Sequence, residues 1–123
     1  MVLNNNLALV ELEWKSFLEI SERFTAIAFN PSENLTVRIQ NAFKAVEFAL
    51  QAYAAKYGKN RLSRENELLF VELNFGFKAA SDYRVLIDAY FNSYKRILSN
   101  DRARDALRRA SLLLEKIHAV LRG

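Results

Sequence analysis

The scarcity of residues that interrupt helices is the feature that most constrains this chain. Three glycines and one proline occur in 123 residues. Alanine, leucine, glutamate, lysine and arginine dominate the segments between them, and these residues favour helices. The stretch from Leu69 to Val71 could form a strand, but it lacks strict alternation and has glutamates on both sides. The sequence therefore predicts an all-α fold, an up-and-down bundle of four to five helices in one domain over residues 1–123.

Polar residues, glycine and proline predict where the helices begin and end. The first helix is expected to begin after Asn4-Asn5-Asn6, whose side chains can accept hydrogen bonds from first-turn amides. Pro31 disfavours α geometry in the residue before it, so this helix should end at about Phe29. Gly76 and a possible cap at Ser81-Asp82 predict a break within residues 79–82. The other expected helices run from Asn34 or Thr36 to Tyr57, from Ser63 to that break, from Tyr83 to Leu98, and from the cap at Ser99-Asn100-Asp101 to Arg122.

The expected helix that ends at Tyr57 is apolar on two sides. Its main stripe is accompanied on the opposite side by Ala45, Phe48, Ala52 and Ala55. Such a helix either occupies the centre of the bundle or contacts a second copy. The expected helix that ends at Leu98 is crowded with aromatic residues, including Tyr90, Phe91 and Tyr94. These residues and Phe48 are the predicted interface of a homodimer or a partner protein, although stacking on a base is an alternative for the tyrosines.

Positive charge gathers in the second half of the chain. The net charge is +4, and residues 57–123 hold thirteen Lys and Arg against eight Asp and Glu. The predicted ligand-binding residues stand at and just before the start of the last helix: Lys95, Arg96, Arg102, Arg104, Arg108 and Arg109. Because the planar guanidinium fork suits phosphate, a nucleotide or an RNA backbone is a sensible ligand. The alternative is a solvated surface that Asp101 and Asp105 partly neutralise.

Several classes of site are excluded or disfavoured by composition. The absence of cysteine excludes disulfides, thiol catalysis and sulfur-ligated metals, and it favours a cytoplasmic location. One histidine leaves too few ligands for a metal site, and no metal or cofactor is expected. That histidine, His118, is a candidate general base, although helix-end packing is the favoured interpretation. No apolar run approaches the roughly 20 residues that span a bilayer, so no membrane partner is expected.

Two segments resemble HEPN domains, the higher eukaryote and prokaryote nucleotide-binding family. The segment Asn41-Ala-Phe-Lys-Ala-Val-Glu-Phe-Ala-Leu-Gln-Ala-Tyr-Ala-Ala-Lys-Tyr-Gly58 is similar to the Ala-rich helix that opens their core and ends in Lys-x-Gly. The segment from Arg102 to Leu121 is similar to their last helix in its Ala-x-x-Ala-Leu steps and its Leu-Leu-Glu-Lys-Ile finish. The resemblance covers about Leu7 to Leu121.

The resemblance implies a bundle of four or five helices, usually a homodimer, in a family that includes toxin ribonucleases paired with nucleotidyltransferase antitoxins. Its catalytic members carry an arginine, four to six residues and then a histidine near the start of the last helix. Here eight residues separate Arg109 from His118, which is not that register. We therefore expect a non-catalytic module that binds nucleotide, RNA or a partner protein. A structural bundle that docks a protein through its aromatic face is the alternative, and a ribonuclease using His118 and Arg109 is the least favoured interpretation.

Overall fold

Five α-helices account for most of this chain. The computed structural model describes the backbone of residues 2–123 and the side chains of residues 8–123. Within that range there is no strand, so the predicted all-α fold is confirmed. The helices are α1 (Val2–Ala28), α2 (Leu35–Lys56), α3 (Glu67–Phe75), α4 (Phe77–Tyr94) and α5 (Asn100–Arg122), and a short 3₁₀ helix, η1 (Arg64–Asn66), precedes α3.

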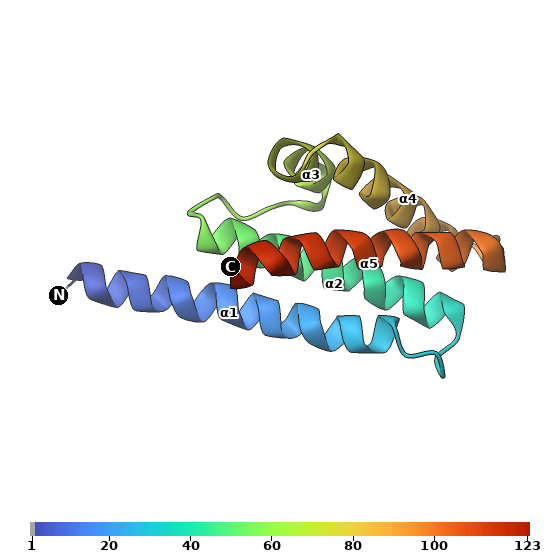
Figure 1. Ribbon diagram of the computed structural model, residues 1–123, viewed down its shortest axis with the longest axis horizontal. Helices are drawn as coiled ribbons and strands as arrows, with labels where there is room; N and C mark the ends of the chain where they lie inside the picture. The colour runs from blue at the N-terminus through green and yellow to red at the C-terminus, as the bar shows by residue number, and fades with distance from the viewer. Residues whose placement is uncertain (1) are drawn as a thin grey trace.

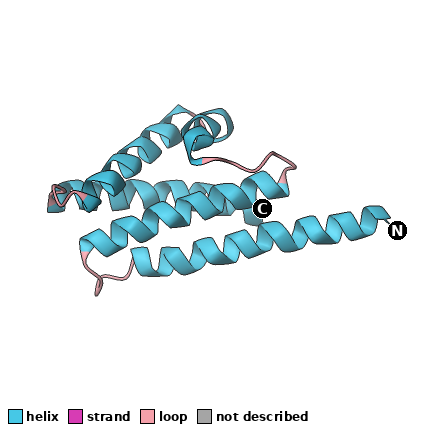
Figure 2. Ribbon diagram, turned by 180° about the vertical axis from the view of Figure 1, so that it is seen from behind, coloured by secondary structure: helices cyan, strands magenta, loops and turns pink. Residues whose placement is uncertain are grey.

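The four long helices alternate in direction. Figure 1 shows α2 running back along α1, α4 crossing above α2 at an angle, and α5 returning between α4 and α1. The view from behind in Figure 2 shows the same order, with the short helix α3 folded back at the start of α4. The central position belongs to α2, which contacts α1, α3, α4 and α5. This is the expected up-and-down bundle.

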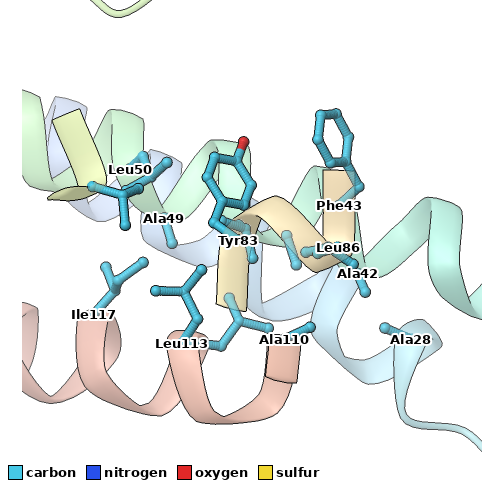
Figure 3. Packing of buried hydrophobic residues seen from close by; sticks show 14 of the residues in the cluster. Ala28, Ala42, Phe43, Ala49, Leu50, Tyr83, Leu86, Ala110, Leu113 and Ile117 are labelled. Atoms are coloured by element: carbon cyan, nitrogen blue, oxygen red, sulfur yellow. The ribbon is translucent and has the colours of Figure 1, made fainter. Parts of the chain in front are cut away.

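Both apolar sides of α2 pack against other helices of the chain. Ala42 and Ala49 lie in the core with side chains of α4 and α5, as Figure 3 shows, and Ala45 on the other side is also fully buried. Phe48 stacks on Phe24 of α1 with ring centroids 5.7 Å apart. Small side chains let helices approach closely, which is how one helix can pack against several others. Of the two alternatives predicted for this helix, the structure shows the central position.

Three of the expected helix ends follow from local hydrogen bonding. The Asn34 side chain accepts a hydrogen bond from the Val37 amide at 2.8 Å and caps α2. The Ser99 hydroxyl accepts one from the Arg102 amide at 3.3 Å and caps α5. After α2, Gly58 adopts a φ of 68°, in the left-handed region that glycine enters without strain. These predictions are confirmed because each depends on neighbours in sequence.

Three predicted boundaries are wrong. The first helix begins at Val2 and runs through the three asparagines, which fall near its start, where several amides have no acceptor within the helix in any case. The break predicted within residues 79–82 lies at Gly76, whose φ of 97° and ψ of 172° are open almost only to glycine. The following helix therefore starts at Phe77 and ends at Tyr94, earlier at both ends than expected.

Candidate functional site

The arginines of the last helix divide between two of its sides. Residues seven apart in a helix share a side, so Arg102 and Arg109 lie together. Arg104 and Arg108, four apart, lie on a different side. Figure 1 shows α4 along one side of α5 and α1 along the other. The structure thus separates the predicted cluster into two groups with different neighbours.

The first group faces α4 and is paired with carboxylates. Arg102 donates from Nη2 to Oδ2 of Asp88 at 2.6 Å. Arg109 donates from Nη1 to Oδ1 of Asp82 at 3.1 Å and from Nε to Oδ2 of Asp105 at 3.1 Å. The Asp82 side chain is only 7% exposed, so Arg109 neutralises an acid that the bundle buries. These two arginines stabilise the contact of α4 with α5.

The second group lines a hollow between α5 and the turn that joins α1 to α2. We call this hollow the arginine groove. Its volume is about 460 Å³, and three arginines contributed by α2 and α5 surround it. None of its described lining residues is a carboxylate; they are Phe29, Arg38, Arg104, Leu107, Arg108, Ser111 and Leu112. The local field there is positive, and phosphate is the chemical group that three guanidinium forks suit best.

Each arginine of the groove is held in a different way. Arg38 donates from Nε to the Ala28 carbonyl at 2.8 Å, at the negative end of α1, so its guanidinium is positioned without being neutralised. Arg104 forms no ion pair with any residue whose side chain the structure describes. Arg108 pairs with Asp105 at 2.9 Å, but both side chains are well exposed, and such pairs are weak. Hydrogen bonds from Arg108 and Arg109 lower the pKa of Asp105 below its usual value.

A second hollow of about 350 Å³ continues the arginine groove along α5. The two share Phe29 and Ser111, and the second is polar where Thr25, Glu115, His118 and Arg122 line it. Phe29 and Ser111 therefore stand at the junction of a cationic hollow and a polar one. A ligand longer than a single phosphate would meet hydrogen-bonding groups along this side of α5.

His118 lies beside Ser21 of α1, with His118 Nε2 and Ser21 Oγ 3.0 Å apart. The single hydroxyl proton of Ser21 is donated to the Ala45 carbonyl at 2.7 Å. Nε2 of His118 is therefore the donor to Ser21, and the hydroxyl is not activated as a nucleophile. Burial, followed by the positive charge of Arg122, lowers the pKa of His118. His118 is a neutral, structurally bonded side chain at pH 7.

The two residues considered for catalysis are not brought together. Arg109 faces Asp82 of α4, whereas His118 faces Ser21 of α1. His118 is nine positions after Arg109, which is two and a half helical turns, so the two side chains project from opposite sides of α5. Among the described residues, no group of three or more acidic or histidine side chains could hold a metal ion. No described helix is long and apolar enough to cross a membrane.

The remaining predicted site residues lie away from the groove. Lys95 and Arg96 are exposed on the loop between α4 and α5, where Arg96 has a φ of 57°. Tyr90 is buried and stacks on Phe43 with centroids 4.0 Å apart, so it belongs to the core. Phe91 and Tyr94 are 49% and 59% exposed at the end of α4. These two are the aromatic residues of the predicted interface that remain open to a partner.

A second cluster of charges joins α2, η1, α3 and α4. Glu67 is 2% exposed and accepts a hydrogen bond from the Tyr83 hydroxyl at 3.1 Å. Arg64 binds both carboxylate oxygens of Glu47 at 3.0 and 3.1 Å. Burial, aided by a hydrogen bond and the negative charge of Glu47, raises the pKa of Glu67 to about 8. Glu67 is therefore largely protonated at pH 7, which permits two carboxyl groups to share this junction.

Three residues of these sites, Ser21, Arg38 and Glu67, are not among the predicted ones. Ser21 interrupts an apolar stripe, and a buried hydroxyl needs partners, so this position carries a usable signal. Glu67 resembles an exposed acid at a helix start, and nothing in its neighbours indicates burial. Arg38 becomes significant only because α5 packs beside the end of α1.

Comparisons with known proteins find no relative of this chain. No family model matches this chain, and neither the curated proteins nor the solved structures contain a match to it.

Proposed function

We propose that this chain is a non-catalytic helical module that binds RNA or a nucleotide through the arginine groove. The observation that carries the proposal is that Arg38, Arg104 and Arg108 surround one hollow whose described lining includes no carboxylate. Of the three, only Arg108 has an acidic partner, the exposed Asp105, so the guanidinium groups repel one another and a bound phosphate would relieve that repulsion. The resemblance of the second and last helices to HEPN domains points to the same class of ligand.

The polar continuation of the groove, which Glu115 also lines, favours a ligand that extends beyond a single phosphate. Ser111, His118 and Arg122 extend the same side of α5 beyond the three arginines. A single-stranded RNA can place successive phosphates and riboses along such a surface. The proposal assigns no chemistry to the site, because the Ser21 proton is already donated to a backbone carbonyl and Arg109 is held by Asp82.

The test is fluorescence anisotropy with a labelled single-stranded oligoribonucleotide. We expect Arg104→Gln/Arg108→Gln to weaken binding more than tenfold and to reduce the slope of log K against log salt by about 1.4, since each lost phosphate contact on a single strand contributes about 0.7. Competition by a free nucleoside monophosphate then shows whether the groove accepts a mononucleotide.

A charge-matched control separates the groove from the net charge of the protein. Lys59→Gln/Arg61→Gln removes two positive charges from the exposed loop between α2 and η1. We expect this control to weaken binding less than about threefold through the long-range field alone. Equal losses in the two double variants, or no binding by the unaltered protein at about 50 mM salt, would refute the groove as the site.

Docking of a partner protein through the aromatic end of α4 is a second candidate function. The exposure of Phe91 and Tyr94 favours it. In that case a defined protein complex is lost on Tyr94→Ala and survives Arg104→Gln/Arg108→Gln. Tyr94 is the better position for this test, because Tyr90→Ala would also remove core packing on Phe43.

A further inference from the structure

Two exposed apolar surfaces of the molecule have no role in the arginine groove. The first, the α3 face, consists of Glu65, Leu69, Glu72, Leu73 and Phe77. The second, the α4–α5 tip, consists of Phe91, Tyr94, Lys95, Arg96 and Ile97. The apolar members of both are between 49% and 75% exposed, which is unusual for six large side chains of so small a domain.

The α3 face is apolar and acidic. Leu69 and Leu73 are one helical turn apart and are 58% and 75% exposed, while Val71 between them is buried on the opposite side. Glu65 and Glu72 are exposed and lie one turn from Leu69, and neither forms an ion pair with a residue whose side chain is described. Phe77, four residues after Leu73 and just beyond the break at Gly76, is 74% exposed.

The α4–α5 tip is apolar and basic. Lys95 and Arg96 are exposed, and no ion pair joins them to the described part of the chain. The charged members of the tip are Lys95 and Arg96, whereas those of the α3 face are Glu65 and Glu72. The tip is therefore positively charged and the α3 face negatively charged.

The two aromatic rings of the tip are held in place before any partner arrives. The Tyr94 ring meets Tyr90 edge to face at 5.2 Å, and the Phe91 ring does so at 5.4 Å. Tyr90 is itself fixed by stacking on Phe43. The Ile97 amide closes the turn by donating to the Asn92 carbonyl at 3.4 Å. A preorganised surface loses little conformational entropy on binding, which favours its use as a docking site.

We propose that the α3 face of one copy of this chain docks on the α4–α5 tip of a second copy. The two surfaces stand at opposite ends of α4, an 18-residue helix about 27 Å long, so one molecule cannot close the contact on itself. The contact joins unlike surfaces head to tail, which builds a ring or an open chain of copies. Apolar side chains supply the attraction, and the opposite charges set the register.

This proposal is independent of RNA binding, since neither surface includes a residue of the arginine groove. The patches are small, so the contact belongs among weak, reversible interfaces at the low end of the size range. The weight-average mass should therefore rise with protein concentration between about 10 μM and 1 mM, and the rise should shrink as salt increases.

Sedimentation velocity on two variants and their mixture tests the geometry. Leu73→Lys blocks the α3 face and leaves the tip, whereas Tyr94→Glu blocks the tip and leaves the α3 face. We expect each variant alone to stay monomeric and the equimolar mixture to form a one-to-one dimer and nothing larger. The mixture has a single productive contact, because each variant supplies the surface that the other lacks.

Other outcomes overturn the proposal. A symmetric dimer through either surface would leave one of the two variants dimeric on its own. A wild-type chain that stays monomeric at about 1 mM would show that neither surface binds a second copy. The milder reversals Glu72→Lys and Lys95→Glu, both at exposed positions, repeat the design without removing an apolar side chain. Restored association in their mixture is expected, and its absence would remove the charge argument.

Discussion

Two regions of the molecule differ in how their charged residues are paired. One is the side of α5 on which α4 packs, called the α4 side here, and the other is the arginine groove. On the α4 side the buried acids are compensated: Asp82 pairs with Arg109, and Glu67 is protonated and accepts a hydrogen bond from Tyr83. In the groove the charges are accessible, and Arg104 has no carboxylate partner within the described structure. Buried charges require compensation inside the fold, whereas surface charges do not. The difference indicates which charged residues stabilise the bundle and which are available to a ligand.

The largest expected effect comes from Glu67. The pKa of its carboxyl group is about 8 in the folded protein and is expected near the ordinary value of 4.5 in the unfolded chain. Between these values the folded state binds more protons, so the free energy of unfolding falls as pH rises, by up to about 1.4 kcal/mol per pH unit. Glu67→Gln cannot ionise and removes this contribution.

Urea unfolding of the wild type and of Glu67→Gln at pH 5, 6.5 and 8 measures the effect of Glu67. The variant should gain stability relative to the wild type as pH rises, because its side-chain amide does not ionise and can still accept the hydrogen bond from Tyr83. A difference between the two proteins that does not change with pH would mean that Glu67 is ionised in the folded state. Glu67 would then carry a charge in the folded protein, as the arginines of the groove do, and the contrast between the two regions would be lost.

The next largest effect is expected for Arg109. Arg109→Leu leaves the buried Asp82 carboxylate without its partner and should lower the free energy of unfolding by about 2 to 3 kcal/mol. The cost falls below that of a fully buried pair because the Arg109 side chain is 29% exposed. Arg104→Leu, on the groove side of the same helix, is the matched control and should change stability by less than about 0.5 kcal/mol. Equal losses from the two variants would erase the distinction between the regions.

A smaller effect is expected at Ser21, beneath the polar end of the groove. Ser21→Ala leaves the Ala45 carbonyl and Nε2 of His118 without their hydrogen bonds, at a cost of about 1 to 2 kcal/mol. Because His118 is the only histidine, its ring nitrogens can be followed by NMR without overlap. We expect the proton of the neutral ring on Nε2 and a pKa below 6.5. A proton on Nδ1 would contradict the assigned hydrogen bonds.

The local part of this fold could be predicted from sequence, and the charge network could not. Asn34, Gly58 and Ser99 act on amides and carbonyls within a few residues, so their roles are visible in the chain itself. Ser81-Asp82 also resembles a helix cap, but Asp82 serves as the partner of Arg109, which is 27 residues away. Without the packing of α4 on α5, nothing distinguishes a capping aspartate from a buried one.

The same limit explains why the sequence does not show which arginines of the predicted cluster have carboxylate partners in the fold. Helical spacing alone separates Arg102 and Arg109 from Arg104 and Arg108, but it does not say which pair faces the aspartates of α4. That answer depends on α4, and the third arginine of the groove comes from α2. Tertiary structure determines which of these guanidinium groups are paired with the aspartates of α4.

The smallest effect is expected for Arg102, and it sharpens the comparison most. Arg102 lies on the α4 side but is paired with Asp88 at the surface, where the two side chains are 53% and 61% exposed. Solvent screens such a pair, so Arg102→Ala should change the free energy of unfolding by less than about 1 kcal/mol. Binding of the oligoribonucleotide should fall by less than about threefold, because Arg102 does not line the arginine groove. If Arg102→Ala weakened binding as strongly as Arg104→Ala in the same anisotropy titration, the ligand would span both sides of α5. Arg102 would then have to be counted among the arginines that bind the ligand and not only among those that pair with α4.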